Sequence, residues 1–382
     1  MSRHGWTALG VGALMALAGA VVGHSAPLLI GLGLCLAVGV ALGWVALGGG
    51  LDLERRLEPV RVEVGEEARS FLTVENRSRT ASLPLPVVDR VGTTEVPLTV
   101  PTLRPSGSTE LSYTPPTDRR GVFAVGPLTS LRGDPWQFVQ RHRSHGDLAT
   151  LLVYPRHQVL RPLPPSAQRS LEAPTSDSSA MGTQTFHQLR DYVTGDDRRM
   201  IHWRSYARTG NLVVRQHVDT SLPEVAVMLD LRPARHSEES FEEAVEIAAS
   251  VLVLCGRQSF PVHLFLTDGR VLTAPPGGDP IAYFLDQLAA VEVDPDSSGD
   301  ADLSRLVQAA ASSVAGHRLL VVTGRPTPAD MSSIAVLGRR CAQVVVVDAH
   351  PEGEVAGGAG VVVAPVRSAA EFAELWNQGL MT

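Results

Sequence analysis

The sequence predicts three consecutive parts: a two-helix transmembrane hairpin, an all-β immunoglobulin-like sandwich and an α/β domain. Two stretches near the start carry no charged residue and are long enough to cross a membrane as helices. About 100 residues of short alternating runs follow, which is typical of a β-sandwich. The remainder alternates strand-like and helical runs, which predicts a doubly wound domain with a mainly parallel sheet. We expect the hairpin at residues 1–50, the sandwich at 57–156, a linker at 161–184 and the α/β domain at 185–382.

The apolar stretches are Trp6 to Gly23 and Ala26 to Gly48. Each can span the roughly 30 Å of membrane hydrocarbon as a helix rising about 1.5 Å per residue. Only His24 and Ser25 lie between them, and Pro27 stands at the start of the second helix. This spacing predicts a tight hairpin of two membrane-spanning helices.

Charge around the hairpin predicts its orientation. Arg3 precedes the first span, and Arg55 and Arg56 follow the second. Because positive residues stay on the cytoplasmic side, both ends of the hairpin and the large C-terminal part are expected in the cytoplasm. A cleaved signal peptide, with Ala18-Gly-Ala20 as its cleavage site, is an alternative for the first stretch.

Composition narrows the possible chemistry. All 33 basic residues of the 382-residue chain are arginine. A chain without lysine has no Walker A phosphate loop, kinase lysine, Schiff base or Ser–Lys pair. The net charge of −7 argues against a protein that coats nucleic acid. Cys35, Cys255 and Cys341 lie far apart in apolar runs, so neither a zinc site nor a disulfide framework is predicted.

Periodicity places the elements of the two larger parts. In the sandwich, Val60–Val64 alternates with period two and Ala149–Tyr154 is a compact strand-like run. Strands of the α/β domain are expected at Glu224–Asp230, Val262–Leu266, Arg318–Thr323 and Gln343–Asp348. Its helices are expected at Glu239–Gln258, Pro280–Val291, Asp302–Val314, Asp330–Leu337 and Ala369–Asn377.

The segment TGDDRRMIHWRSYARTGN, residues 194–211, concentrates acids, arginines and aromatic residues. Thr194 and Asp197 fit a capping box, and Asp196 is an alternative N-cap, so a helix is expected to start here. Met200, Trp203 and Ala207 would share one face of that helix, with Trp203 as its anchor, and Gly210 supplies a left-handed stop. The following run, Asn211–Val218, is expected to be a strand directed toward the α/β sheet.

The run from Leu189 to Gln216 resembles the signature of the bacterial domain-of-unknown-function family DUF58. Its recurring residues fall here at Arg190, Tyr192, Gly195, Asp196, Arg199, Ile201, Trp203, Ser205, Ala207 and Arg208. The upstream run Arg119–Arg141 and the hairpin are also similar to such proteins. The resemblance implies a von Willebrand factor A-like domain after the signature, and association with MoxR-type AAA+ ATPases and transglutaminase-like membrane proteins. It implies no known reaction.

Domains of that type often hold a divalent cation through Asp-x-Ser-x-Ser at the end of the first strand. Here the run Asp230-Leu-Arg-Pro-Ala234 keeps the carboxylate and loses both hydroxyls. Arg232 would repel a cation and can neutralise Asp230 instead. Thr323-Gly324-Arg325, at the end of a later strand, offers no second carboxylate. We therefore predict no metal site at Asp230, Arg232 and Ala234, and a surface or edge ion pair between the first two.

The arginine-rich signature admits several roles. Arg190, Arg199, Arg204 and Arg208 could join the sandwich to the α/β domain as a structural clasp, or they could form a docking surface for a partner. Aspartates between these arginines weaken the positive field that a phosphate or a nucleic acid would need, which argues against a role in binding them. Catalysis lacks support because the three histidines of this region, at positions 187, 202 and 217, have no helical pairing and no nucleophile motif accompanies them.

These observations predict a non-enzymatic scaffold or adaptor at the bacterial inner (plasma) membrane. It would be a multi-pass protein held by residues 6–23 and 26–48, would act with a MoxR-type ATPase, and would need no cofactor and no nucleic acid. The alternatives are an envelope-related hydrolase with a site between domains and, as a third candidate, an arginine-rich nucleic-acid binder.

Overall fold

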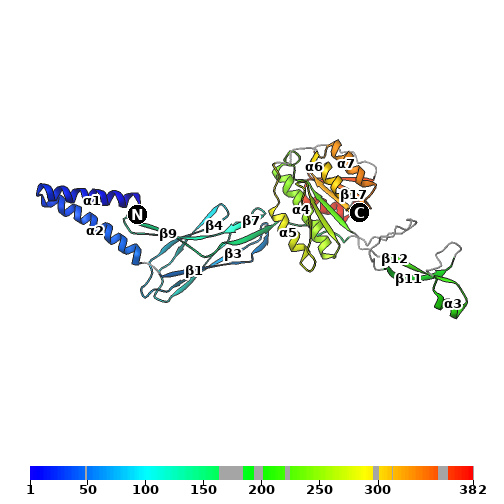
Figure 1. The fold of residues 1–382 in the computed structure, drawn as a ribbon, viewed down its shortest axis with the longest axis horizontal. Coiled ribbons are helices and arrows are strands. Elements are labelled where there is room, and N and C mark those ends of the chain that lie inside the picture. The colour runs from blue at the N-terminus through cyan, green and yellow to red at the C-terminus, as the bar shows by residue number, and fades with distance from the viewer. Residues whose placement is uncertain are drawn as a thin grey trace. The chain divides into compact units, whose positions relative to one another are not determined.

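The computed structural model describes residues 1–47, 50–162, 184–192, 201–219, 224–295, 301–311, 313–351 and 360–381. The chain divides into two compact units, each described by itself below. One comprises Met1–Pro155 with Ala289–Val291, and the other comprises Arg156–Leu288 with Glu292–Thr382. Figure 1 shows the elements in chain order.

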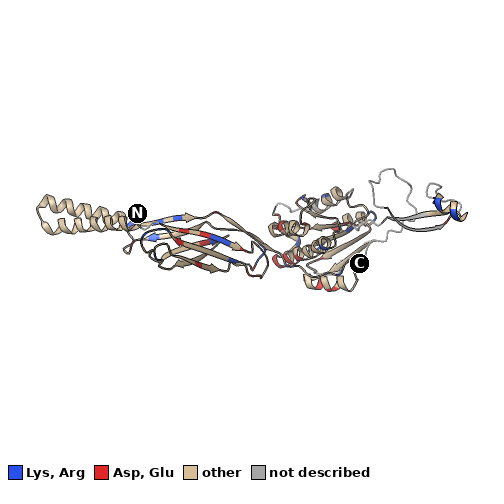
Figure 2. Ribbon diagram, turned by 90° about the horizontal axis from the view of Figure 1, so that it is seen from below, with Lys and Arg blue, Asp and Glu red and all other residues tan. Residues whose placement is uncertain are grey.

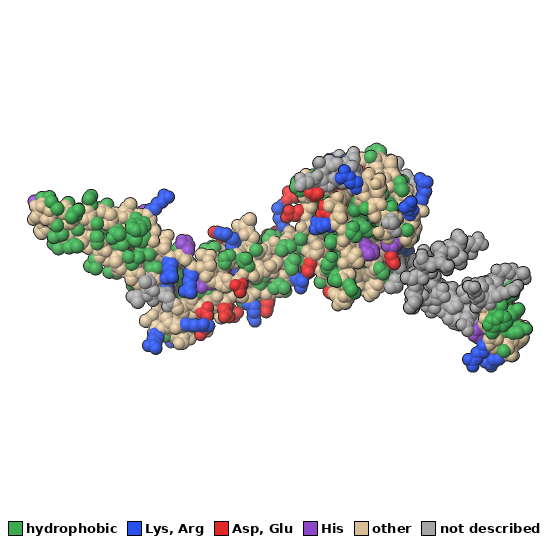
Figure 3. All heavy atoms as spheres, viewed as in Figure 1, with side chains coloured by type: hydrophobic (Ala, Val, Ile, Leu, Met, Phe, Trp, Pro, Cys, Tyr) green, Lys and Arg blue, Asp and Glu red, His purple; other side chains and the backbone are tan. Residues whose placement is uncertain are grey.

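The first unit opens with two helices, α1 (Arg3–Val22) and α2 (Ser25–Leu47). Both are long and apolar enough to cross a membrane, as the sequence predicts. Figure 2 shows almost their whole length free of charged residues, and Figure 3 shows many hydrophobic side chains on the face of the hairpin that it presents. Gly23 ends α1 in a left-handed conformation with φ of 74°, which gives the tight turn between the helices.

Glycine lets the two helices approach closely. A Cβ atom on Gly31 of α2 would collide with the backbone of Gly12 and Ala16 in α1, and one on Gly19 would collide with the backbone of Leu28. Such small residues bring helix backbones into contact where lipid supplies no hydrophobic drive for association. The hairpin is thus packed along its length.

Two sheets form the sandwich that follows. The strands β1 (Leu51–Glu58), β3 (Arg69–Asn76) and β6 (Ser108–Tyr113) make a three-stranded antiparallel sheet. The second sheet runs in the order β2 (Arg61–Glu63), β10 (Ala149–Tyr154), β7 (Gly121–Val125), β4 (Leu85–Val91), β8 (Leu128–Gly133) and β9 (Gln140–His145), with β5 (Thr94–Val100) also on β4. Leu53 and Leu72 of the first sheet pack against Val87 and Leu128 of the second, so the core lies between the sheets.

The sandwich begins at Leu51, not at residue 57 as predicted. The strand β1 was not predicted because Arg55, a charged residue, takes one of the inward positions where an alternating strand usually has an apolar residue. The Arg55 side chain is buried and donates to a carboxylate oxygen of the equally buried Asp89 at 3.0 Å. Asp89 also accepts a hydrogen bond from the Tyr113 hydroxyl at 2.7 Å. A buried charge is tolerated here because its partner and hydrogen bonds are supplied.

The second unit contains a six-stranded sheet in the order β15–β14–β13–β16–β17–β18. Its strands are β13 (Val225–Leu229), β14 (Val262–Leu266), β15 (Val271–Thr273), β16 (Arg318–Thr323), β17 (Gln343–Asp348) and β18 (Val361–Pro365). All pairings are parallel except that of β15 with β14. The chain moves from β13 to β14 on one side and then to β16 on the other, which is the doubly wound arrangement predicted.

Helices cover both faces of this sheet (Figure 1). They are α4 (Glu238–Arg257), α5 (Pro280–Ala290), α6 (Ala301–Ala310), α7 (Pro328–Gly338) and α8 (Ala369–Asn377). Leu306 of α6 and Ile334 of α7 pack on one face, against Met228, Val321 and Val346. The helix α4 packs against β13, β16 and α8. The predicted helix Asp302–Val314 ends earlier than expected, at Ala310.

The DUF58-like signature forms a separate two-stranded element, called the signature arm below. It consists of β11 (Gln184–Asp191), α3 (Trp203–Thr209) and β12 (Val213–Asp219), with β11 and β12 antiparallel. The strand predicted at Asn211–Val218 is present as β12, and among the described residues it pairs with β11. Of the predicted linker 161–184, positions 163–183 lie outside the described residues and Gln184 already belongs to a strand.

The signature helix begins later than predicted. It starts at Trp203, and Ile201 just before it forms a β-bridge with Val214, so Ile201 is not helical. Residues 193–200, with the predicted caps Thr194, Asp196 and Asp197, lie outside the described residues. The predicted stop is confirmed, since Gly210 is left-handed with φ of 72° and its N–H donates to the Tyr206 carbonyl.

Replacing Gly31 with leucine is expected to weaken the hairpin by about 1–3 kcal/mol, because the added side chain forces apart two backbones in contact. Gly33→Leu is the matched control, because nothing lies within 4 Å of a Cβ at Gly33 and the gain in helix propensity is the same. Titration with sodium dodecyl sulfate, followed by tryptophan fluorescence, measures the difference. Equal midpoints for the two variants would contradict the packing described.

Candidate functional site

Polar side chains gather at the carboxyl ends of β13 and β16. Here the winding of the sheet reverses, and ligands of open α/β sheets bind at such a switch point. Asp230 directly follows β13, and Thr323 is the last residue of β16. Both are buried, with 1% and 0% of their surface exposed. The Thr323 hydroxyl donates to Asp230 Oδ2 at 2.7 Å and so links the two strand ends.

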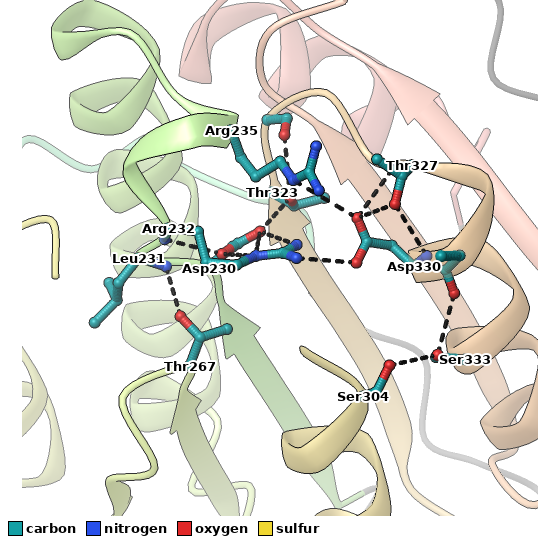
Figure 4. A network of polar contacts seen from close by, with 12 residues as sticks. Asp230, Leu231, Arg232, Arg235, Thr267, Ser304, Thr323, Thr327, Asp330 and Ser333 are labelled. Atoms are coloured by element: carbon teal, nitrogen blue, oxygen red, sulfur yellow. Dashed lines mark hydrogen bonds and ion pairs between the residues drawn. The ribbon is translucent and has the colours of Figure 1, made fainter. Parts of the chain in front are cut away.

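Arg232 fills the centre of this edge (Figure 4). Its Nε donates to Asp230 Oδ1 at 2.9 Å and its second terminal nitrogen donates to Oδ2 at 2.7 Å, a two-pronged contact. The other terminal nitrogen, Nη1, donates to Asp330 Oδ1 at 3.0 Å. Arg232 is only 1% exposed, so one guanidinium is enclosed between two buried carboxylates.

Asp330 enters the site from the first turn of α7. The backbone N–H and hydroxyl of Thr327 donate to Asp330 Oδ2 at 3.0 and 2.8 Å, and the Asp330 N–H donates back to the Thr327 oxygen. This capping box starts the helix, and a carboxylate is stabilised at a helix N-terminus. Arg235 adds a second positive charge, with its Nε 3.9 Å from Asp330 Oδ2.

Electrostatics keep these groups charged. Burial disfavours the ionised form of Asp330, but hydrogen bonds from Arg232 and Thr327 outweigh it, and the pKa of the carboxyl lies below its ordinary value. Burial likewise disfavours the Arg232 cation, but Asp230 and Asp330 outweigh it and raise its pKa. Asp330 and Arg232 are therefore held in their charged forms at neutral pH.

The neighbouring strand ends are also tied internally. The Leu231 N–H donates to the Thr267 hydroxyl, just after β14, at 2.8 Å. Asp348, at the end of β17, accepts from the backbone N–H groups of Arg325 and His350, each at 3.0 Å. These polar groups hold the loops of the edge in place.

The predicted pair of Asp230 and Arg232 is present at the edge of the sheet, which was one of the two predicted positions, and it is buried there. Asp330, which lies 98 residues further along the chain than Arg232, supplies the second carboxylate of this buried group. Ala234 is exposed and contributes nothing to the site. Sequence reasoning missed both Asp330 and Thr327, although the run Thr-Pro-Ala-Asp carries a readable capping signal.

The residues of this edge do not fit a divalent cation. Carboxylate and hydroxyl oxygens of the kind that bind magnesium are present, but the Arg232 guanidinium already takes their hydrogen-bonding and charge capacity. Among the described residues, no group of three or more His, Cys, Asp or Glu side chains could hold an ion. The arrangement can fix three loops together, and we derive no chemical step from it.

The signature residues lie on the signature arm. Trp203 is 60% exposed and Tyr206 is 44% exposed, with their rings edge to face at 6.2 Å. The prediction that Trp203 anchors a buried helix face is therefore wrong, because α3 buries no residue. Arg204, Ala207 and Arg208 are exposed on the same helix.

The remaining signature residues are placed only in part. Arg190 lies in β11, and the Tyr192 N–H donates to the Leu212 carbonyl at 2.9 Å, which closes the strand pair. Gly195, Asp196 and Arg199 lie outside the described residues.

One histidine–serine contact occurs in the arm. His202 Nδ1 lies 2.7 Å from the Ser205 hydroxyl oxygen, and the Ser205 N–H donates to the His202 carbonyl at 2.9 Å. A nucleophilic serine needs a base that a third group orients. The described residues supply no such group to His202, so the contact is explained by its position at the start of α3.

Comparison with known proteins gives a family and no activity. Residues 188–355 match the family described as "Protein of unknown function DUF58", so the chain carries a region of that family, as the signature predicts. None of the curated proteins matches.

Several solved structures resemble part of the chain. A CARDB domain from Pyrococcus furiosus, solved with di-metal ions, is 19% identical and covers 27% of this chain and 89% of its own, at a TM-score of 0.21. A putative cell surface protein domain from Methanosarcina acetivorans is 25% identical and covers 28% and 91%, at a TM-score of 0.19.

Arg232→Leu is expected to destabilise the α/β domain by about 3–5 kcal/mol, because it leaves two buried carboxylates without a cation. Urea unfolding of the full chain in mild detergent measures the change. Arg270→Leu is the control, because Arg270 pairs with Asp268 at a partly exposed position, where a pair contributes about 1 kcal/mol or less. A bound Mg²⁺, Ca²⁺ or Mn²⁺ ion at Asp230 in the unaltered protein would overturn the account of this edge.

Asp330 should make the domain acid-sensitive. Its folded-state pKa lies below the ordinary value of 3.8, so its contribution to stability is present above that pH and is lost as pH falls through the folded pKa. In Asp330→Asn this part of the pH dependence should disappear, while overall stability is lower. Unfolding free energies of both proteins are measured from about pH 5 down to about pH 2, which covers the range below the ordinary pKa of an aspartate, where the difference is expected. Parallel curves would show that Asp330 is not held ionised by Arg232.

Proposed function

We propose that this chain, which carries a DUF58 region, is a membrane-anchored adaptor that binds an acidic partner protein through the exposed face of α3. The observation that carries the proposal is the exposure of Trp203, Tyr206, Arg204 and Arg208 on one short helix. Tryptophan, tyrosine and arginine contribute most strongly to protein interfaces. The partner we propose is a MoxR-type AAA+ ATPase, which is the association that the family resemblance implies.

Charge on α3 favours docking over an internal clasp. Neither Arg204 nor Arg208 has a carboxylate partner among the described residues. They stand four residues apart, where like charges on a helix repel each other. A clasp built from arginines would pair them with carboxylates or carbonyls, whereas a docking face leaves them available to an acidic partner.

The buried ion network of the α/β domain supports the adaptor role as well. We propose that it is a von Willebrand factor A-like domain in which Arg232 stands in place of a cation, because the guanidinium bridges Asp230 and Asp330 at the switch point. A domain stabilised in this way offers a rigid scaffold beside the signature segment in the sequence, with no catalytic ion required.

Photo-crosslinking in membranes tests the adaptor. A photoreactive residue in place of Trp203 should crosslink to a AAA+ ATPase, whereas one in place of Val336, which is 51% exposed on α7, should not. Combining the Trp203 crosslinker with Arg204→Glu and Arg208→Glu should abolish the product through charge repulsion. The same product from both positions, or no protein product from Trp203, would overturn the proposal.

The membrane topology that accompanies this function has its own test. Because Arg3 and the arginines after α2 favour the cytoplasm, a fluorescent protein fused to the C-terminal end should fluoresce, and a phosphatase active only outside should be inactive there. Fusions placed after Gly23, between the helices, should give the opposite result. Phosphatase activity at the C-terminal end would reverse the proposed orientation.

A further inference from the structure

The loop between β8 and β9 lies against the ends of the two apolar helices. The Ser2 N–H, just before α1, donates to the Phe138 carbonyl at 2.9 Å. Val139 packs in a buried cluster with Ala41 and Val45 of α2. If α1 and α2 cross a membrane, this loop is therefore at the membrane surface.

Exposed aromatic side chains lie on this loop and near these ends of the helices. Asp134 is 4% exposed and accepts hydrogen bonds from two backbone N–H groups of the loop, at 3.0 and 2.6 Å, so the loop has a defined shape. It presents Trp136, 57% exposed and stacked on Phe138. Trp6 and Trp44, near the same ends of the helices, are 63% and 47% exposed. Exposed tryptophans of this kind sit at the boundary of membrane and water.

Arginines follow directly on β8 and β9. Arg132 of β8 stands opposite Arg141 of β9, and Ser130 stands opposite Arg143, so the three arginines share one face of the sheet. They line a pocket together with the end of α2 and the start of β1. Its lining includes Val45, Leu51, Arg132, Arg141, Arg143 and His145. Figure 3 shows arginine side chains on the sandwich next to the end of the helical hairpin.

This positive charge is not neutralised within the chain. None of the three guanidinium groups forms an ion pair with a carboxylate of the described residues. Like charges directly opposite on neighbouring strands destabilise the pairing. Burial lowers the pKa of Arg132, and burial with the nearby Arg143 lowers the pKa of His145, although Asp52 acts in the opposite direction. An external anion would relieve all of these costs.

We propose that the β8–β9 face is a binding site for the headgroups of anionic phospholipids in the membrane that α1 and α2 enter. Arg132, Arg141 and Arg143 take the phosphate, for which guanidinium groups are suited by two-pronged hydrogen bonds. Val45 and Leu51 supply an apolar wall for the glycerol end of the lipid. The inference rests on membrane anchoring and is independent of the adaptor role of α3.

Lipid preference of the full chain provides the test. The protein is purified in an uncharged detergent and titrated with short-chain phosphatidylglycerol, short-chain phosphatidylcholine or inorganic phosphate. Phosphatidylglycerol should bind more tightly than phosphatidylcholine, and Arg141→Gln with Arg143→Gln should weaken its binding by about fivefold per arginine, on the order of 25-fold together. Vesicle insertion, measured separately, reports whether anchoring itself holds.

A matched pair of variants controls for net charge. Arg69→Gln with Arg90→Gln removes two exposed arginines of the same sandwich that pair locally with glutamates, and should leave lipid binding unchanged. Equal affinity for the two lipids, or equal loss in both double variants, would overturn the site. If inorganic phosphate competes at the concentration at which phosphatidylglycerol binds, the proposal that the ligand is a membrane lipid would be overturned. The arginines would then be assigned to a soluble phosphate ligand.

Discussion

The contact of Arg232 with Asp230 and Asp330 determines how the carboxyl edge of the α/β domain is built. It joins the segment after β13 to the first turn of α7, and Thr323 extends the link to β16. Two buried carboxylates without a cation would repel each other at a low effective dielectric constant. The three loops can therefore adopt their arrangement only while the guanidinium is between them. The cation belongs to the chain itself, so the edge does not depend on an ion from solution.

Tightly packed elements of the chain contrast with the exposed helix α3. Glycine contacts hold α1 against α2, and a buried ion pair of Arg55 and Asp89 supports the sandwich next to them. In contrast, α3 buries none of its residues and has two exposed aromatic rings. Binding surfaces commonly occur on short elements carried by a stable scaffold. The exposed side chains suited to binding lie on α3 and on the β8–β9 face, while the buried networks support the structure.

Sequence reasoning located the buried elements and missed the edges. The strands β14, β16 and β17 have the predicted bounds, because central parallel strands are continuous apolar runs. The edge strand β15 is only three residues long and gives a weak signal, and Arg55 interrupts the signal in β1. The edge strand β18 was missed although Val361–Pro365 is an apolar run. The pair of Asp230 and Arg232 was predictable from two-residue spacing, whereas the contact of Arg232 with Asp330 spans 98 residues of the chain. The pairing of Ile201 with Val214 could not be predicted, because capping patterns are local and do not show which strand a residue joins.

The position of β9 has one further consequence. Within the part of the chain that the structure describes it is the last strand of its sheet, and its outer row of N–H and C=O groups faces no strand there. Membrane proteins diffuse in the plane of the membrane, so copies of one protein meet more often there than in solution. Arg141 and Arg143 give this edge the same sign on every copy, and like charge at a sheet edge opposes pairing with the same edge of another copy. The arginines that would attract lipid phosphate would thus also keep neighbouring copies from joining edge to edge.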